Sequence, residues 1–342
     1  MFLPALLAVL SISVESAQQP VEAKPVPAPA SIQLPVGWDP GTRFTLEITK
    51  SGEEFREDGS DKGTKVGAVC RFSLQCEFTT RNGSGYGLRT TFGPCKVLDG
   101  PAEAVPLLTK LLGAFDGFTA ELRTDIAGKP IELVAADDAE KRFGVSWKNA
   151  IDALALEIAK QRRSRTPPEP APTSEQMNQI STEMHALVLG GGIGDWFLRQ
   201  IGSFTLPMGR QFEIGKPELF ESQLPNPFGP EPLPSRATME LSALRVDKNE
   251  AEIRWSDVLD PEKAPAVLRT SLRQIAKATK DASWLDEARL AALADCVRLD
   301  VRYVVDTKTG LTRSMEFRQE QKGTPAPRVD VLKIERIDSV PK

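Results

Sequence analysis

The sequence predicts an α+β protein in which curved antiparallel β-sheets pack around helices. Three observations lead to this class: long segments with alternating apolar and polar residues, turn-forming residues between these segments, and other segments whose apolar residues recur every three or four positions. The order of strands, helix and turn-bearing hairpin occurs twice along the chain. This repetition suggests the hypothesis that the fold consists of two related halves.

The clearest strand covers residues 66–78. Its even positions hold Val, Ala, Cys, Phe or Leu, whereas its odd positions include Arg71, Gln75 and Glu77. The turn-forming run 82–85 follows, and the next segment again keeps its apolar residues at even positions, which predicts a β-hairpin. The candidate apolar face of this hairpin consists of Phe72, Leu74, Phe78, Tyr86, Leu88 and Phe92.

Further strands and helices follow from the same two periodicities. Alternation predicts strands at 44–48, 118–122, 239–241, 251–255, 297–305, 311–317 and 329–337. Helical spacing predicts helices at 101–113, 138–163, 174–187 and 261–294, the last broken near 280–283. Thr173 and Gln176 have the spacing of a capping box at the start of the third helix.

The N-terminus has the features of an export signal. Residues 2–14 are apolar and nearly uncharged, and the small residues Ser16 and Ala17 follow. We therefore expect a signal peptide at 1–17, a periplasmic or extracellular location, and a mature chain without a membrane span, since no later apolar run approaches the required length of about 20 residues.

Proline-rich segments divide the rest of the chain. A Pro-rich leader at 18–40 is expected to be an extended, poorly packed tether. A first β-rich half with helices covers 41–163, a Pro-rich linker between helices covers 164–173, and a second β-rich half with helices covers 174–342.

Charge and composition weigh against several functions. With 43 Lys and Arg against 47 Asp and Glu, the chain lacks the positive excess that nucleic-acid binding uses. Its single histidine, His185, excludes metal sites that need two imidazoles, and no Cys-x-x-Cys pair occurs. The glycine run 190–194 matches no phosphate-binding motif, so it is expected to end a helix and begin a flexible connection. We expect neither a cofactor nor a metal.

Asp125 and Asp306 are the carboxylates at matching positions in the two halves. They could meet as a catalytic pair across a pseudo-symmetric cleft, or each could bond its own backbone at the head of a hairpin turn. The turn interpretation is favoured because Asp commonly occupies that position and neither residue lies in an Asp-Thr-Gly or Asp-Ser-Gly motif.

The four cysteines define a candidate disulfide. Cys70 and Cys76 lie about 20 Å apart along one strand and cannot bond to each other. A two-residue loop at 82–83 would set Cys70 opposite Cys95 but would mismatch the apolar faces; a three-residue loop matches the faces and sets Cys70 opposite Lys96. Cys70–Cys95 is the favoured bridge, which leaves Cys76 and Cys296 as buried thiols or as a second bridge.

A resemblance to known proteins rests on two segments: residues 206–215, which a Pro-rich loop follows, and the late turn at 305–311. Together they resemble a group of exported bacterial proteins of unknown function that have a Leu-Pro phrase before a strand and an Asp-x-x-Thr-Gly turn late in the chain. The match covers 204–317, but the aromatic residue that those proteins have after the glycine is missing after Gly215. The general architecture is similar to that of Lol-type lipoprotein carriers, whose curved antiparallel sheet embraces helices and holds acyl chains.

These features favour an exported, noncatalytic binding protein for an apolar or lipid-like ligand. Long amphipathic strands create a continuous apolar face, and any part that the helices leave uncovered forms a groove. Two alternatives remain: a hydrolase that uses carboxylates, and a purely structural interaction protein.

Overall fold

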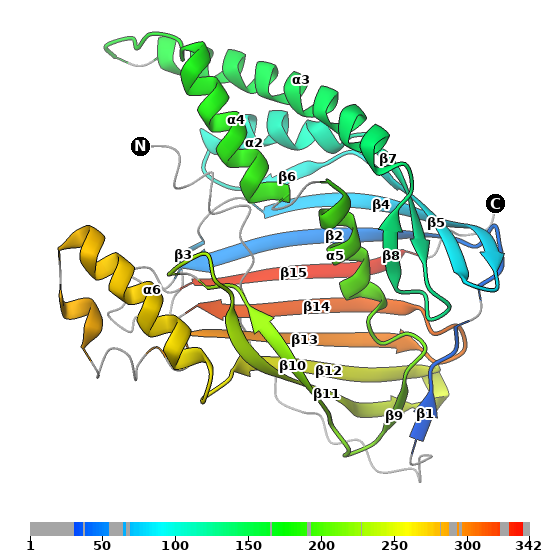
Figure 1. Ribbon diagram of the computed structural model, residues 1–342. Coiled ribbons are helices and arrows are strands. Elements are labelled where there is room, and N and C mark those ends of the chain that lie inside the picture. Colours follow the sequence, from blue (N-terminus) through cyan, green and yellow to red (C-terminus); the bar gives the residue numbers. More distant parts are fainter. Residues whose placement is uncertain are drawn as a thin grey trace.

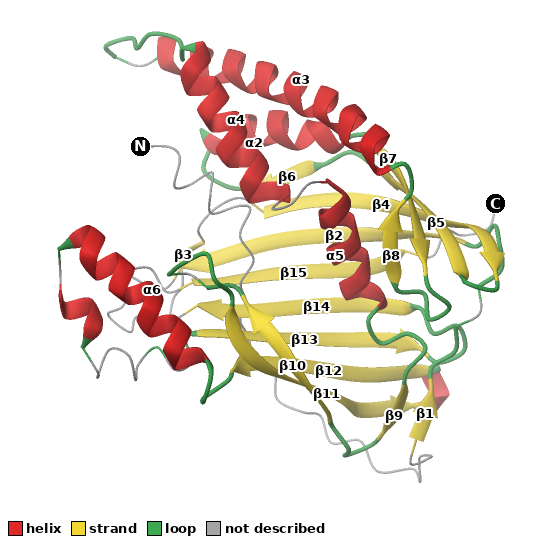
Figure 2. Ribbon diagram, viewed as in Figure 1, coloured by secondary structure: helices red, strands yellow, loops and turns green. Residues whose placement is uncertain are grey.

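A computed structural model of the chain describes residues 31–36, 38–54, 64–65, 69–164, 166–189, 193–226, 228–280, 282–286, 293, 296–321 and 328–337. In this described part, an antiparallel sheet of 13 strands curves around a helix, a smaller sheet has two strands, and further helices lie over the ends of the large sheet (Figures 1 and 2). This arrangement confirms the predicted α+β class.

The strands follow the chain in the order expected for hairpins. They are β1 (Ser31–Gln33), β2 (Arg43–Glu54), β3 (Thr64–Lys65), β4 (Val69–Asn82), β5 (Gly85–Phe92), β6 (Lys96–Asp99), β7 (Thr119–Thr124), β8 (Pro130–Leu133), β9 (Gln211–Glu213), β10 (Glu218–Leu224), β11 (Leu233–Arg245), β12 (Glu250–Leu259), β13 (Val297–Asp306), β14 (Thr312–Gln321) and β15 (Arg328–Ile337). The α-helices are α2 (Ala104–Leu112), α3 (Ala136–Arg163), α4 (Ser174–Leu189), α5 (Ile193–Thr205) and α6 (Ala264–Thr279), and the 3-10 helices are η1 (Gly113–Phe115), η2 (Val246–Lys248) and η3 (Ala282–Leu285).

The two parts of the sequence contribute opposite sides of the sheet. Its main path runs β10-β11-β12-β13-β14-β15-β2-β4-β5-β7-β8, so the strands before the Pro-rich linker occupy one side and those after it occupy the other. The last strand, β15, pairs with β2 from Arg328–Glu54 to Ile337–Thr45 and joins the two sides. Because α3 ends at Arg163 and α4 begins at Ser174, the linker connects two helices as predicted.

The register of the β4–β5 hairpin differs from both expected registers at its turn. Asn82 pairs with Gly85 across a two-residue loop one position later than expected, and the Asn82 side chain accepts hydrogen bonds from the backbone N–H groups of Ser84 and Gly85. A bulge between Phe78 and Thr80 then shifts the pairing to that of the three-residue loop. The bulge thereby restores the match between apolar faces that a simple two-residue turn would lose.

The helix α5 was missed by the sequence analysis, which expected a flexible connection after the glycine run. It begins at Ile193 and crosses the concave face of the sheet (Figure 1). Its buried residues recur at helical spacing and continue into the following turn: Ile193, Phe197, Ile201, Phe204 and Met208. This period was present in the sequence, but the glycines were given more weight than the pattern that follows them.

The end of the Pro-rich leader packs against the fold, which corrects the expectation of a poorly packed tether for residues 31–40. β1 pairs with β9, and both Leu34 and Trp38 are buried. The Trp38 ring stacks on Phe78 with centroids 4.2 Å apart and lies 5.2 Å from Tyr86. Burying such large apolar side chains stabilises the folded state by about 2 kcal/mol or more each. Leader residues before Ser31 lie outside the described residues.

Two apolar cores fill the interior. The larger core contains residues of α2, α3, α5 and the sheet, and the smaller one packs α6 against the ends of β10–β13. α6 contributes Leu268 and Leu272 to the smaller core, and β13 contributes Val297. Leu299 on β13 packs against both cores and so marks the place where they meet.

Candidate apolar binding site

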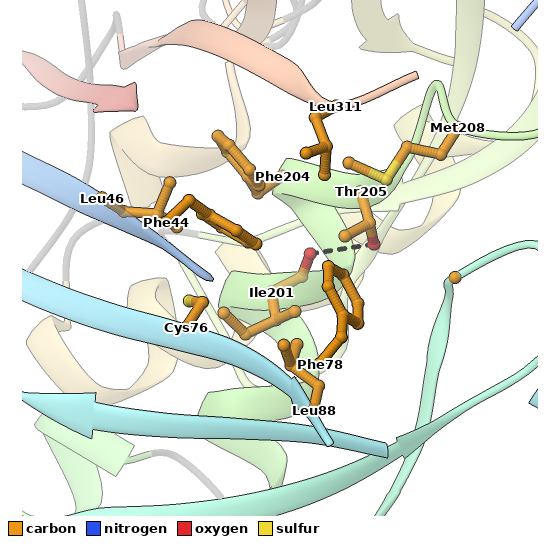
Figure 3. Close-up of a pocket in the computed structure, with 11 residues that line it drawn as sticks. Phe44, Leu46, Cys76, Phe78, Leu88, Ile201, Phe204, Thr205, Met208 and Leu311 are labelled. Carbon is orange, nitrogen blue, oxygen red and sulfur yellow. Dashed lines mark hydrogen bonds between the residues drawn. The ribbon is translucent and has the colours of Figure 1, made fainter. Parts of the chain in front are cut away.

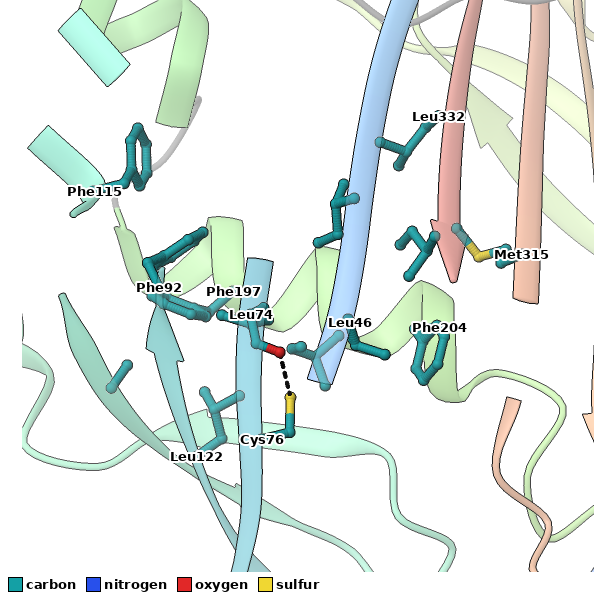
Figure 4. Close-up of a cluster of buried hydrophobic side chains, with 14 of the residues drawn as sticks. Leu46, Leu74, Cys76, Phe92, Phe115, Leu122, Phe197, Phe204, Met315 and Leu332 are labelled. Atoms are coloured by element: carbon teal, nitrogen blue, oxygen red, sulfur yellow. Dashed lines mark hydrogen bonds between the residues drawn. The ribbon is translucent and has the colours of Figure 1, made fainter. Parts of the chain in front are cut away.

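The predicted apolar face of β4 and β5 is largely filled by the protein's own side chains. Five of its six members are buried in the larger core: Leu74, Phe78, Tyr86, Leu88 and Phe92. Figure 4 shows Phe92 beside Phe197 of α5, and their ring centroids are 5.5 Å apart. Phe72 is half-buried. A ligand therefore has no room on most of this face.

A small cavity between α5 and the sheet supports the same conclusion. Its volume is about 10 Å³, which is at the lower limit for one water molecule. The lining is apolar apart from Thr205, whose hydroxyl donates to the Ile201 carbonyl at 3.0 Å within α5 (Figure 3). A cavity of this size and polarity holds no ligand.

The strand register places two rows of side chains on the concave face beside this closed region. One row, from β10 to β2, comprises Phe220, Ala237, Asp257, Leu299, Gln319, Asp330 and Gly52. The other row, from β10 to β4, comprises Glu218, Met239, Trp255, Val301, Phe317, Leu332, Lys50 and Cys70. We call these two rows the concave strip.

The position of the concave strip follows from its neighbours. Tyr303 is two residues after the strip member Val301 on β13 and lies on the same face. Its hydroxyl donates a hydrogen bond to the Ser203 carbonyl of α5 at 3.1 Å. Two residues in the other direction from Leu299, Val297 is packed in the core beneath α6. The strip therefore lies between the sheet region that α5 covers and the region that α6 covers.

Four large apolar side chains of the strip are half-buried and pack against the core: Phe220, Trp255, Leu299 and Phe317. Three other strip members, Met239, Val301 and Leu332, are buried. Phe220 and Trp255 stack with centroids 5.6 Å apart and an interplanar angle of 12°. The Arg210 guanidinium lies 5.2 Å from the Phe220 centroid and 3.2 Å from Glu218, so its charge is compensated.

Buried polar residues accompany these apolar ones. Asp257, Gln319 and Asp330 are 2%, 5% and 1% exposed. Burial raises the pKa of Asp257 above its ordinary value, although the hydroxyls of Ser222 and Ser235 partly offset the shift. Asp257 and Asp330 lie three strands apart in the same row, about 14 Å at 4.8 Å per strand, which is too far for a conventional pair of hydrolytic carboxylates.

The carboxylates of Asp125 and Asp306 cap separate turns, as the favoured interpretation predicts. Asp125 accepts hydrogen bonds from the backbone N–H groups of Ala127 and Lys129, both at 2.9 Å. Asp306 accepts from Lys308 at 2.9 Å and Thr309 at 3.1 Å, and it also binds Arg313. Each carboxylate therefore stabilises its own turn, and the two do not form a catalytic pair.

The remaining residues singled out in the sequence are His185, the glycine run and the cysteines, of which Cys70 belongs to the strip. His185 falls within α4, but its side chain lies outside the described part, as do Gly190 to Gly192. Among the described residues, no group of three or more His, Cys, Asp or Glu side chains is arranged to hold a metal ion. The structure contains no disulfide between the four cysteines, so the Cys70–Cys95 bridge stays a prediction.

Most of the strip was not predicted from the sequence. The alternation at 251–255 and 297–305 predicted strands, but the candidate apolar face was placed on β4 and β5 alone. Trp255, Leu299 and Phe317 share the parity of the buried residues in their own strands, and that parity was the available signal. The pairing of distant strands, which gathers these residues in one place, had no signal in the sequence.

Comparisons with known proteins identify no family. No family model and no curated protein matches the chain. A solved structure described as "Lipid-protein interactions in lipovitellin" is similar with a TM-score of 0.37 and 8% identity; the alignment covers 89% of this chain and 26% of that one. The structure of Rv2717c from M. tuberculosis is similar with a TM-score of 0.21 and 8% identity, and the alignment covers 85% and 91% of the two chains. Likenesses this low show no shared activity.

None of the helices in the described part of the chain is long and apolar enough to span a bilayer.

Proposed function

We propose that the protein binds an apolar or lipid-like ligand on the concave strip. The observation that carries this proposal is the set of half-buried large apolar side chains on four strands of one face: Phe220, Trp255, Leu299 and Phe317. Single exposed apolar residues are ordinary in proteins, but neighbouring ones on a concave face are typical of ligand sites.

The energy available from this surface is sufficient for measurable binding. Covering about 200 Å² of apolar surface contributes on the order of 5 kcal/mol at 25 cal/mol per Å². Restricting the motion of the ligand offsets part of that gain. The net affinity is therefore expected in the micromolar to millimolar range.

An environment-sensitive apolar dye tests the proposal. The folded protein should bind it saturably, and a phospholipid or long-chain alcohol should displace it. Phe220→Ser should weaken binding about tenfold, whereas Leu219→Ser should leave it unchanged, because Leu219 is on the opposite face of β10 and is 77% exposed. Absence of saturable binding to the native protein would instead favour a structural role.

We also propose that the protein is exported. The apolar run at 2–14 and the small residues Ser16 and Ala17 support this proposal. Intact-mass analysis of protein from its native source should show that about 16 to 19 N-terminal residues are absent. Recovery of the full-length chain from the cytoplasm would contradict export.

A further inference from the structure

Two buried polar atoms lie together at one end of the concave strip. Asp257 is 2% exposed and Ser235 is 3% exposed, yet Asp257 Oδ1 and Ser235 Oγ have no hydrogen-bond partner at conventional distance in the described part of the chain. Asp257 pairs with Ala237 on β11, two residues from Ser235, so both side chains occupy the same face of adjacent strands.

Ser222 adds a third polar side chain to this place. It pairs directly with Ser235 across β10 and β11, and the hydroxyls of both serines are close enough to Asp257 to lower the pKa of that carboxyl group. Three successive strands thus present two hydroxyls and one carboxyl group within an otherwise apolar corner. We call Asp257, Ser222 and Ser235 the polar corner.

An unpaired buried polar atom destabilises the folded state, and the penalty is larger for a carboxylate. Packing does not require a polar side chain at position 257, because the neighbouring residues Ala237, Leu299 and Trp255 on the same face are all apolar. A hydrogen-bonding partner supplied from outside the chain would remove the penalty.

The chemistry of the polar corner selects the type of partner. A carboxylate oxygen accepts hydrogen bonds, and a hydroxyl both donates and accepts. The partner that fits is therefore a hydrogen-bond donor such as an alcohol or amine, whereas a carboxylate has no hydrogen to donate to the Asp257 oxygen. Trp255 lies two residues from Asp257 on β12 and stacks on Phe220, and the row continues from Trp255 through Val301 to Phe317, which provides an apolar path for a chain.

We propose that the polar corner binds the hydrogen-bond-donating head group of an amphiphile, an alcohol or an amine, whose hydrocarbon chain lies on the concave strip. This inference rests on the function proposed above, because it specifies the class of ligand for the same surface.

Three probes of equal chain length test the head-group preference: a long-chain alcohol, an alkylamine and an alkyl carboxylate, each competing with the apolar dye. The alcohol, the amine or both should bind at least about tenfold more tightly than the carboxylate at neutral pH, a difference of about 1.4 kcal/mol. The probe that binds more tightly, the alcohol or the amine, identifies the preferred head group. Equal affinities for all three probes would overturn the inference.

Matched variants assign the preference to the polar corner. Asp257→Asn preserves the side-chain volume and should reduce the preference for the amine about tenfold, while Ser235→Ala should weaken binding of the alcohol. Asp300→Asn is the control, because Asp300 is on the neighbouring strand β13 and accepts a hydrogen bond from Ser256 on the opposite face at 2.8 Å. It should change none of the affinities.

The outcomes separate the two proposals. If the dye binds but Asp257→Asn and Ser235→Ala leave every probe affinity unchanged, the polar corner is purely structural and this inference is wrong, while the proposed function stands. If the native protein binds neither the dye nor any probe, the proposed function fails as well. Dye binding by folded Asp257→Asn provides the check that the variant retains its concave strip.

Discussion

The indole N–H of Trp38 donates a hydrogen bond to the backbone carbonyl of Thr309 at 3.1 Å, across 271 positions of the sequence. The contact joins the end of the Pro-rich leader to the turn between β13 and β14. Trp38 also lies against Gly128 in the turn between β7 and β8, and the Pro35 carbonyl lies against Gly310. The leader thus passes between the two Asp-headed turns at matching positions in the two parts of the sequence.

Replacement of Trp38 tests whether the leader stabilises the fold. Trp38→Ala removes stacking on Phe78, contact with Tyr86 and the hydrogen bond to Thr309, and it should lower the free energy of unfolding by about 3 to 5 kcal/mol. Chemical denaturation measures the change. The exposed neighbour Asp39 provides the control, since Asp39→Ala should change stability by less than about 0.5 kcal/mol. Equal effects would show that the packed leader contributes little.

The close contact between Trp38 and Gly128 predicts that a side chain at position 128 destabilises the fold. A Cβ at this position would overlap the Trp38 ring, and the backbone φ of +77° is already unfavourable for other residues. Gly117 has a φ of +69° but no atom within 4 Å of an added Cβ. Gly128→Ala should therefore reduce stability by about 1 to 3 kcal/mol more than Gly117→Ala in thermal or chemical denaturation. A similar loss in both variants would mean that the Trp38 ring moves aside freely.

The sequence predicted the strands well because alternation is local. The alternation of β4, β13 and β15 is visible within each segment. The capping box at Thr173 also formed as expected: the Thr173 N–H donates to the Gln176 side chain at 3.0 Å, and the Gln176 N–H donates to the Thr173 hydroxyl at 3.2 Å. Long-range pairing was not predictable in this way. The contact between β15 and β2 and the packing of Trp38 between two turns depend on segments that are hundreds of residues apart.

The candidate site was harder to predict for the same reason. The face of β4 and β5 was predicted to be apolar, but the sequence did not indicate that α5 covers it. Asp257 lies just beyond the predicted strand 251–255, and its burial follows from the placement of β10, β11 and β12 around it. A local pattern can thus identify an apolar face, while the three-dimensional pairing decides which part of it remains accessible.

The distinction between covered and open parts of the face is testable in β4. Leu74 is 1% exposed, so Leu74→Ala should reduce the free energy of unfolding by about 2 to 5 kcal/mol through cavity formation. Phe72 is half-buried, and Phe72→Ala should cost less than the full-core value of about 3 to 5 kcal/mol expected from its parity alone. Gln75→Ala, on the exposed face, should have little effect. A loss of stability at Gln75 as large as that at Leu74 would contradict the phase of the strand.

Acid stability is expected to depend on Glu252, which is 6% exposed on the face opposite the concave strip. Burial alone would raise the pKa of Glu252, but Arg302 at 2.7 Å and Arg254 at 3.4 Å lower it below the ordinary value. A lowered pKa in the folded state adds stability above the unfolded-state pKa of about 4.3, and this contribution is lost as the pH falls through the folded-state value.

Denaturation between pH 6 and pH 3 measures this dependence. The native protein should lose stability over this interval, and Glu252→Gln should lose less, because it lacks the titrating group. At pH 6 the variant should be less stable by about 1 to 3 kcal/mol, since it leaves the arginines without their carboxylate partner. Glu132→Gln, which breaks the exposed ion pair with Arg123, is the control and should follow the native curve. Parallel curves for the native protein and Glu252→Gln would contradict this role.

The final prediction concerns the Cys70–Cys95 bridge. Cys70 pairs with Val97 in the β4–β6 ladder, and not with Lys96 as expected from a three-residue loop. Cys95 is two residues before Val97 and is therefore diagonal to Cys70. Diagonal Cα atoms in a sheet lie about 7 to 8 Å apart, slightly beyond the usual disulfide range, so a shift of about 1 Å allows the bond. Burial and the neighbouring Cys70 raise the pKa of Cys95 to about 12, and burial raises that of Cys70 to about 11.

These raised pKa values leave few thiolates at neutral pH, so the bridge should form slowly in the folded protein and faster during oxidative folding. Closing a loop of about 25 residues should add about 3 to 4 kcal/mol to the stability of the oxidised form. Peptide mapping under non-reducing conditions, applied to protein from an oxidising compartment, should find Cys70 joined to Cys95, with Cys296→Ser unchanged and Cys95→Ser lacking the bridge. Four free thiols, or a bond from Cys76 to Cys95, would show that the two cysteines do not form the predicted pair.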